Sequence, residues 1–229
     1  MKTNRIDHPT KIGLFGGTFN PIHIGHLQSA LDVLTQFSLE LIYFIPSALP
    51  PHKTKGILAT ARNRSEMVRL TIENYPQLNL NDIELNRTGP SYTIDTIRYF
   101  KTKMSTDSKL YFILGVDAFM EIHTWKNFLN LFEEVAFIVM SRPQGSTTTP
   151  NFETAVESFV QRNISLEFKL SAQGQSLIHP RYQTIHLTRV VPIDIASSKI
   201  RQMIRNGKDI TQWVDPGVAH YIRTKGLYR

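Results

Sequence analysis

Short apolar runs alternate along this chain with longer segments whose apolar residues recur at the three- and four-residue spacing of a helix. The short runs predict strands at residues 12–15, 39–45, 78–85, 110–114, 135–140 and 185–191. The helical spacing predicts helices at residues 24–37, 61–74, 91–104, 125–134, 152–162, 197–205 and 216–224. Such alternation is typical of a parallel sheet with helices on both faces. We therefore predict a Rossmann-like, doubly wound α/β fold.

The domain organisation follows from the length of the chain and from its lack of repeats. A chain of 229 residues is long enough for one large or two small domains, and no internal repeat divides it. We expect a single domain over residues 1–229, with its core at about 11–192 and a small helical C-terminal subdomain at about 193–229. Residues 145–181 show the weakest pattern. They could form a loop over the site, a dimer contact or an extension without a role.

Composition narrows the class of protein. The chain is 41% hydrophobic and 20% charged, as in soluble globular proteins, and no apolar run is long enough to span a bilayer. It contains no cysteine, which excludes disulfides and thiolate catalysis and is compatible with the cytoplasm. A net charge of +7 would suit nucleic acid or small phosphate-bearing substrates. Because Lys and Arg form no run, we expect no nucleic-acid and no membrane partner.

Residues 16–26, which read GGTFNPIHIGH, join the first predicted strand to the first predicted helix. A helix N-terminus offers unpaired N–H groups and a partial positive charge, which suit phosphate. Gly16 and Gly17 carry no side chain, so a phosphate could approach the backbone closely. His23 and His26 share one face of the first helical turn, where each can donate a hydrogen bond and carry charge near neutral pH. The stretch therefore predicts a phosphate site.

Two other interpretations of the histidine pair are weaker. A metal site would need further ligands, and the chain has no cysteine and no second His or Glu cluster to supply them. We therefore predict no metal site built by the protein. His23-Ile24-Gly25-His26 also forms the HIGH motif of class I aminoacyl-tRNA synthetases, but this chain has no room for a tRNA-binding domain.

Two loops near the predicted strand ends could also serve a phosphate-bearing substrate. Pro50 and Pro51 stiffen the loop after the second strand and would hold His52 and Lys53 in place to reach a phosphate. Asp117 follows the strand at residues 110–114, which places its carboxylate at the edge of the sheet where ligands bind in such folds. It could accept a hydrogen bond from a ribose hydroxyl or help to hold magnesium.

Residues 196–201 begin a late helix that could supply further phosphate ligands. Ser197 or Ser198 would cap this helix, and free N–H groups with hydroxyls suit a phosphate. Arg201 would add a charged fork one turn later.

These motifs together resemble the nicotinate-nucleotide adenylyltransferase family of HxGH nucleotidyltransferases. They occur in this order over nearly the full chain: GGTFNPIHIGHL, PPHK, Ser91-Tyr92-Thr93, Gly115-x-Asp117, Thr124-Trp125, Ser141-Arg142-Pro143 and Gly226-Leu227-Tyr228. The resemblance implies transfer of an adenylyl group from ATP to nicotinate mononucleotide, giving nicotinate adenine dinucleotide and pyrophosphate. It also implies that Mg²⁺ arrives with ATP rather than in a protein cage, and it leaves a homo-oligomer open.

The resemblance further implies roles for individual residues. The catalytic residues would be His23, His26 and Arg201. ATP would contact Gly16, Gly17, Thr18, Phe19, His23, His26, Ser197, Ser198 and Arg201. Nicotinate mononucleotide would contact Thr18, His52, Lys53, Tyr92, Thr93, Asp117, Trp125 and Lys126, with Trp125 stacked on the pyridine ring. Ala196 departs from the family pattern, in which a serine is common at its position.

We also expect the acid mononucleotide to be preferred over its nicotinamide form. Thr124 is a good N-cap residue, so Trp125 and Lys126 would begin a helix and offer unpaired N–H groups. Residues 91–93 begin another helix, and two converging helix N-termini favour an anion.

Two alternatives to this function remain. Phosphopantetheine adenylyltransferase shares the HxGH motif, although its chains are typically shorter. A catalytically silent nucleotide-binding protein is the alternative outside enzymes, and the intact His23, His26 and Arg201 argue against it.

Overall fold

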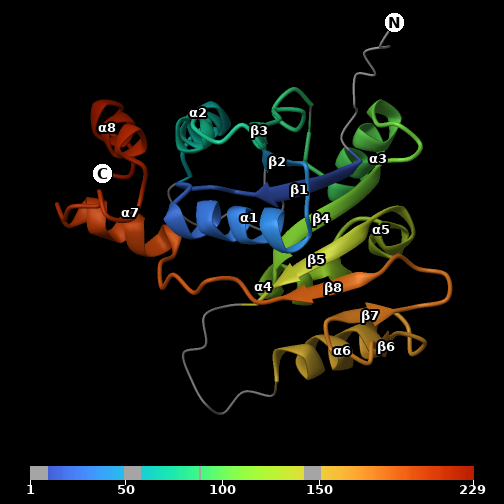
Figure 1. The fold of residues 1–229 in the computed structure, drawn as a ribbon. Helices are drawn as coiled ribbons and strands as arrows, with labels where there is room; N and C mark the ends of the chain where they lie inside the picture. Colours follow the sequence, from blue (N-terminus) through green and yellow to red (C-terminus); the bar gives the residue numbers. More distant parts are fainter. Residues whose placement is uncertain (1–9, 49–57, 88, 142–150) are drawn as a thin grey trace, which may run out of the picture.

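The computed structural model describes residues 10–48, 58–87, 89–141 and 151–229 and contains an eight-stranded sheet (Figure 1). The strand order is β3-β2-β1-β4-β5-β8-β7-β6. From β3 to β8 in that order neighbouring strands are parallel, whereas β7 and β6 are antiparallel to their neighbours. The predicted Rossmann-like parallel sheet is confirmed, and the antiparallel edge is an addition that the sequence did not indicate.

Strands and helices alternate from β1 to β4, after which several helical elements or strands follow one another directly. The strands are β1 (Lys11–Gly17), β2 (Leu41–Pro46), β3 (Leu78–Leu80), β4 (Lys109–Gly115), β5 (Ala136–Met140), β6 (Lys169–Leu170), β7 (Ser176–Ile178) and β8 (Ile185–Thr188). The helices are α1 (Ile24–Gln36), α2 (Ala61–Ile72), α3 (Thr93–Lys103), α4 (Val116–Met120), the 3₁₀ turn η1 (Ile122–Thr124), α5 (Phe128–Glu134), α6 (Phe152–Asn163), α7 (Ser197–Arg205) and α8 (Pro216–Thr224). The described helices include none long and apolar enough to cross a membrane.

Several predicted elements are shorter in the structure than the sequence pattern indicated. The strand predicted at 78–85 ends at Leu80, because the Asn81 side chain accepts the backbone N–H of Ile83 at 3.0 Å and turns the chain. The strand predicted at 185–191 ends at Thr188. The helix predicted at 125–134 begins only at Phe128, since the residue before it has a φ of 51°, in the left-handed region.

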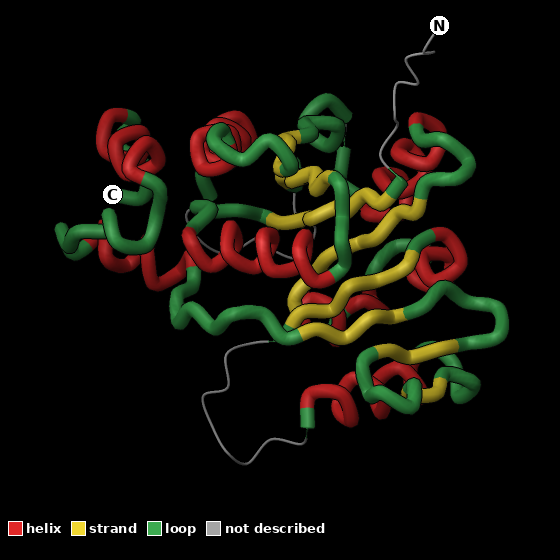
Figure 2. The backbone as a smooth tube through the Cα atoms, viewed as in Figure 1, coloured by secondary structure: helices red, strands yellow, loops and turns green. Residues whose placement is uncertain are grey.

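Helices cover both faces of the sheet (Figure 2). Successive residues of a strand point to opposite faces, and on β1 the Leu14 and Phe15 side chains enter different hydrophobic clusters. The cluster with Phe15 contains buried residues of α1, α2, α7 and α8. The cluster with Leu14 contains buried residues of α3, α4, α5 and α6. Each sheet face therefore has its own set of helices.

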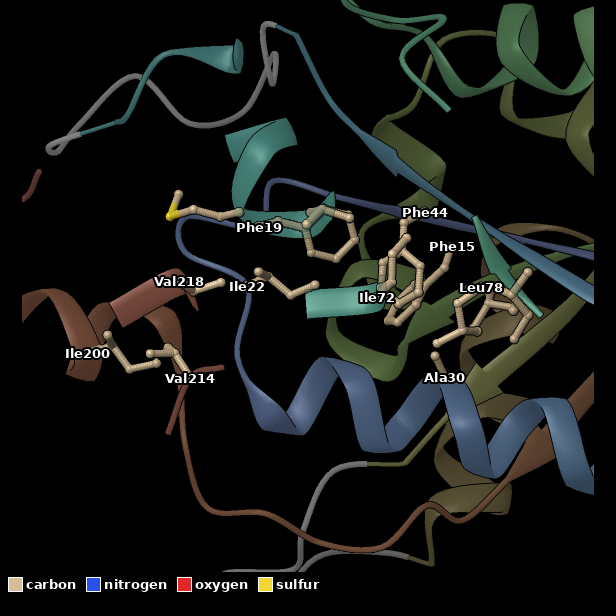
Figure 3. Packing of buried hydrophobic residues seen from close by; sticks show 14 of the residues in the cluster. Phe15, Phe19, Ile22, Ala30, Phe44, Ile72, Leu78, Ile200, Val214 and Val218 are labelled. Atoms are coloured by element: carbon tan, nitrogen blue, oxygen red, sulfur yellow. The ribbon is translucent and has the colours of Figure 1, made fainter. Parts of the chain in front are cut away.

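The C-terminal helices share the cluster that contains Phe15. Figure 3 shows Ile200 of α7 and Val218 of α8 near Ile22, which precedes α1. All three side chains are fully buried. The segment predicted as a C-terminal subdomain thus packs into the same core as α1 and α2, and its separation at residue 193 stays a prediction.

The described part of the weakly patterned segment extends the sheet. In α6, Val156 and Val160 are fully buried in the cluster with Leu14, and β6 and β7 form the antiparallel edge. Figure 1 shows these elements at the opposite end of the molecule from α7 and α8. Residues 151–181 therefore extend the sheet at that end and pack on its core.

The fold has a switch point between β1 and β4. The chain leaves β1 toward β2 on one side and leaves β4 toward β5 on the other, although β1 and β4 are neighbours. In open α/β sheets ligands bind at such a point, outside the carboxyl ends of the strands. These ends are Gly17 of β1 and Gly115 of β4, so the predicted phosphate stretch lies at the switch point.

Candidate functional site

His23 and His26 lie together at the start of α1, as their spacing predicted. His23 is the N-cap residue, and the two rings are 3.7 Å apart between centroids. The backbone N–H of His23 donates to Nδ1 of His26 at 3.3 Å. Because Nδ1 accepts, a neutral His26 carries its proton on Nε2, which is then the donor.

His23 is more buried than the sequence suggested. It is 7% exposed, and its Nδ1 has no hydrogen-bond partner among the described residues. Burial lowers the pKa of His23 to about 4, so the ring is neutral at neutral pH, contrary to the expectation that it carries charge there. An ideal Cβ at Gly25 would lie only 3.0 Å from His23 Nδ1, which explains why a residue without a side chain separates the two histidines.

Packing leaves no room for a side chain at the two glycines that end β1. An ideal Cβ at Gly17 would lie 2.7 Å from Cζ of Phe19, and one at Gly16 would lie 3.0 Å from Cζ of Phe112. Phe19 is 2% exposed, adopts a φ of 48° and meets the His26 ring at a centroid distance of 5.2 Å. Aromatic rings therefore occupy the space that a side chain at Gly16 or Gly17 would need, and the approach of a phosphate to this backbone stays a prediction.

The start of α7 reaches this turn. The Ser197 hydroxyl donates to the backbone carbonyl of Pro21 at 2.8 Å, and Nη1 of Arg201 donates to that of Asn20 at 2.8 Å. Ser197 is therefore not the helix cap that the sequence predicted. The N-cap residue is Ala196, which has no side chain to cap the helix, so the hydroxyl of Ser197 is used for a tertiary contact instead.

The C-terminal region also contacts the first turn of α1. The backbone N–H of Ile24 donates to the carbonyl of Trp213 at 2.9 Å. One of the N–H groups expected to be open for phosphate at this helix N-terminus is therefore already bonded. α7 and α8 lie beside the end of α1 at which that helix begins (Figure 1).

Arg64 is a site residue that the sequence analysis missed. It lies fully buried in α2, and its guanidinium donates to the backbone carbonyls of Thr18 at 2.7 Å, Ser47 at 2.6 Å, Ala48 at 3.1 Å and Ala59 at 3.1 Å. Burial lowers its pKa. It thus ties the turn after β1 to the end of β2.

A signal for Arg64 was present in the sequence. Arg64, Met67, Val68 and Thr71 follow one another at three- and four-residue spacing and are all buried on one face of α2. A charged residue on an otherwise apolar helix face requires partners for its donors, so it marks a buried polar contact.

Trp125 connects a second group of predicted residues to β1. It is partly buried and meets Phe112 of β4 edge-on, with the ring centroids 6.2 Å apart. The same Phe112 ring lies against Gly16. The Phe112 ring therefore lies between Trp125 and the glycine turn, near the carboxyl ends of β1 and β4.

Lys126 approaches the start of α3. Its Nζ lies 4.2 Å from the centroid of the Tyr92 ring and 3.9 Å from Oδ2 of Asp95. Tyr92 is the N-cap residue of α3, which begins at Thr93 and has no side-chain cap. The structure thus brings together Tyr92, Thr93, Trp125 and Lys126, which the sequence placed in one subsite.

The prediction that a helix begins at Trp125 and offers its N-terminus to an anion is wrong. Thr124 ends the 3₁₀ turn, and its hydroxyl donates to the carbonyl of Glu121. The backbone N–H of Trp125 donates to Ile122 at 2.9 Å, and no helix begins until Phe128. The packing of Trp125 on β4 outweighs the capping preference of Thr124, since tertiary contacts commonly override local propensity. Of the two helix N-termini predicted around Trp125 and residues 91–93, the described structure contains the one of α3.

The remaining predicted residues are placed as follows. Asp117 is exposed in the first turn of α4, at the carboxyl end of β4, as expected, and Ser198 is exposed in the first turn of α7. His52 and Lys53 lie outside the described residues. Within the described ranges, no group of three or more His, Asp or Glu side chains could hold a metal ion.

A separate cleft of about 680 Å³ lies at the amino ends of β4, β5 and β8, whereas the predicted site lies at the carboxyl ends of the strands. Its lining includes Lys101, Lys109, Tyr111, Glu134 and His186. It contains none of the residues that the sequence predicted for the site.

Comparison with known proteins shows the family of this chain. A family model described as cytidylyltransferase-like matches residues 14–203. A probable nicotinate-nucleotide adenylyltransferase of Desulfatibacillum aliphaticivorans is 39% identical over 219 residues, covering 95% of this chain and 99% of its own. The chain belongs to the nicotinate-nucleotide adenylyltransferase family. A second member, from Moorella thermoacetica, is 34% identical over 99% of this chain and 95% of its own.

Solved structures of nicotinic acid mononucleotide adenylyltransferase show the same fold as this member of the family. The enzyme of Plasmodium falciparum complexed with APC matches with a TM-score of 0.69 at 21% identity, over 96% of this chain and 97% of its own. The same enzyme complexed with NaAD matches with a TM-score of 0.68 at 22% identity.

The buried His23 predicts how the stability of this family member depends on pH. Its pKa of about 4 lies below the ordinary value of 6.5, so the unfolded chain binds a proton first as the pH falls. The stabilisation by the neutral ring is complete above pH 6.5 and is lost between pH 6.5 and 4. We expect the free energy of unfolding to fall over this window by about 3 kcal/mol more in the wild type than in His23→Asn. Urea unfolding followed by circular dichroism would measure both; parallel curves would contradict the burial of a neutral ring.

Proposed function

We propose that this chain transfers the adenylyl group of ATP to nicotinate mononucleotide at the switch point between β1 and β4. The observation that carries this proposal is the pair of adjacent histidine rings at the start of α1, 3.7 Å apart between ring centroids and tilted by 32° to one another. They stand at the carboxyl end of β1 in a chain that is 39% identical to a probable nicotinate-nucleotide adenylyltransferase. The chain is a nucleotidyltransferase by family, and its reaction belongs to NAD biosynthesis.

The reaction needs no covalent intermediate with the protein. A 5′-phosphate oxygen of the mononucleotide forms a bond to the α-phosphorus of ATP, while the bond from that phosphorus to the bridging oxygen breaks and pyrophosphate leaves. Catalysis then depends on positioning and on donors directed at developing charge. His26 would supply its Nε2–H, because its Nδ1 accepts the His23 N–H. His23 would act beside it as a neutral donor, since its pKa is about 4.

The triphosphate of ATP would lie between the start of α1 and the start of α7. Gly16, Gly17, Thr18 and Phe19 would contribute backbone groups, and Thr18 also its hydroxyl. From α7, Ser197, Ser198 and Arg201 would contact the β- and γ-phosphates. The bond from Arg201 to Asn20 uses one of the five N–H donors of the guanidinium, which suits a residue that joins the protein to a phosphate. The uncapped start of α7 adds backbone N–H groups.

Nicotinate mononucleotide would lie between α3 and Trp125, with the pyridine ring stacked on the indole. The ring is positively charged, so the face of Trp125 attracts it beyond plain stacking. Tyr92 and Thr93 at the start of α3 and the ammonium group of Lys126 suit the carboxylate of the acid. Asp117 would bind a ribose hydroxyl, and His52 and Lys53 the 5′-phosphate.

Mg²⁺ would enter as part of the ATP complex. This ion prefers substrate phosphates, one or two carboxylates and water to a cage of protein ligands. The described residues offer no cluster of three His, Asp or Glu side chains, which fits an ion carried by the triphosphate. The cytoplasmic location and a homo-oligomer stay predictions from the sequence.

The choice of acceptor tests the proposed function. Purified protein with ATP and Mg²⁺ should form nicotinate adenine dinucleotide and pyrophosphate when nicotinate mononucleotide is added. The nicotinamide form should give a lower kcat/KM, because its amide cannot pair with the Lys126 ammonium as a carboxylate does. Product chromatography with a coupled pyrophosphate assay would measure all acceptors. Turnover with phosphopantetheine but not with nicotinate mononucleotide would show the alternative transferase instead.

Replacing His26 tests the role of the histidine pair. His26→Ala should lower kcat by about 100- to 1000-fold, the usual effect of removing one preorganised donor to developing charge. His220→Ala is the matched control, because His220 is an exposed histidine of α8 and should leave kcat near the wild-type value. Steady-state kinetics of both folded variants would decide. Near-normal turnover by His26→Ala would show that backbone groups carry the charge.

Replacing Trp125 tests the pyridine site. Trp125→Ala should weaken binding of nicotinate mononucleotide by roughly 1–3 kcal/mol, the scale of one base–aromatic stack, and so raise its KM by about 5- to 150-fold. The KM for ATP should hardly change. Trp125→Phe keeps an aromatic face and should recover most of the loss. If Trp125→Ala instead impaired mainly the use of ATP, the pyridine ring would have to bind elsewhere.

A further inference from the structure

Residues from three distant parts of the chain donate hydrogen bonds to Asn20. Its Oδ1 accepts the backbone N–H of Ala59 at 3.1 Å and the hydroxyl of Tyr228 at 2.7 Å. Its backbone carbonyl accepts Nη1 of Arg201 at 2.8 Å. Asn20 is 7% exposed and lies in the turn between Thr18 and His23, so these bonds fix the backbone that leads into α1.

Tyr228, the penultimate residue, is built into the interior. It is 3% exposed and belongs to the hydrophobic cluster that contains Phe15 and Ile22. Burial raises the pKa of its phenol, so the hydroxyl keeps its proton and serves as a donor. A buried tyrosine places its hydroxyl reproducibly, because the packed ring leaves it little freedom.

We propose that Tyr228 is a positioning residue for adenylyl transfer, which acts through Asn20 on the turn that carries Thr18 and leads into His23. The inference rests on the proposed function. Tyr228 need not touch a substrate in this role. Its hydroxyl donates to the side-chain oxygen of Asn20, while Arg201 of α7 donates to the backbone carbonyl of the same residue. The last residues of the chain therefore help to set the geometry of the first site motif.

The effect on catalysis follows from the precision that in-line transfer requires. A displacement of about 1 Å can cost about 100-fold in rate when it moves reacting groups out of alignment. Without the tyrosine hydroxyl, the Oδ1 of Asn20 would lose the bond from the C-terminal region and keep the bond from the backbone N–H of Ala59. The turn could then sample positions in which the α1 donors no longer meet the developing charge.

The chain offers a matched control for this test. Tyr221 of α8 also donates its hydroxyl to an asparagine, Oδ1 of Asn63 in α2, at 2.9 Å. Both tyrosines thus join the C-terminal region to the rest of the protein by a Tyr–Asn hydrogen bond, but the Tyr221 bond does not reach the turn. Tyr228→Phe and Tyr221→Phe each remove one hydroxyl and keep the ring.

The expected result is a difference in kcat between the two variants. Assayed with saturating ATP and nicotinate mononucleotide well below both melting temperatures, Tyr228→Phe should lose about tenfold or more in kcat. Tyr221→Phe should stay within about twofold of the wild type, because its hydroxyl bonds to Asn63 of α2 and not to the turn. Melting temperatures of both variants would show whether stability explains the difference. Equal kcat values in the two variants would overturn the positioning role.

A double-mutant cycle separates action through Asn20 from other effects of the hydroxyl. If Tyr228 works through Asn20, then Tyr228→Phe should change kcat less than twofold in an Asn20→Ala background. Additive losses would overturn the proposal. A wild-type protein that forms no nicotinate adenine dinucleotide would contradict the proposed function itself. An active wild type with equal kcat in Tyr228→Phe and Tyr221→Phe would contradict only the role of Tyr228.

Discussion

The candidate site depends on the buried guanidinium of Arg64. Its hydrogen bonds to the carbonyls of Thr18, Ser47, Ala48 and Ala59 join the turn after β1 to the end of β2 and to the start of α2. A buried charge is costly unless its donors are satisfied, and here backbone carbonyls satisfy them. The same hydrogen bonds hold the carbonyls of three separate segments in place. The charge and the loops therefore stabilise one another, and the turn between β1 and α1 is held in place.

The same turn is held from the opposite end of the chain. Ser197 and Arg201 of α7 bond to the carbonyls of Pro21 and Asn20, and the carbonyl of Trp213 accepts the first N–H of α1. Ser197 and Arg201, which were predicted to be phosphate ligands, thus hold the turn that leads into α1. The C-terminal helices also share a hydrophobic core with α1 and α2.

The two histidines differ from a pair of charged side chains, because His23 is neutral and the ring of His26 is oriented by a hydrogen bond. Burial keeps His23 neutral, and the bond from its backbone to Nδ1 of His26 sets which nitrogen of the second ring carries the proton. Preorganised donors of this kind stabilise developing charge without reorganising during the reaction. The electrostatics of the site therefore arise from packing around Gly25 and Phe19 as much as from the identity of the two side chains.

The sequence by itself determined the family and the order of most strands and helices, because apolar periodicity and the HxGH spacing are local properties. It did not indicate α4 or the antiparallel strands β6 and β7. It did not reveal the role of Arg64, the Asn20–Tyr228 bond or the extended backbone at Trp125. Asn20 and Tyr228 are 208 positions apart, so no local pattern relates them. Trp125 departs from its predicted helix because Phe112 of β4 provides a ring to pack against. Tertiary structure decided these features, since hydrogen bonds and aromatic contacts across the core outweigh the small free-energy differences of local propensity.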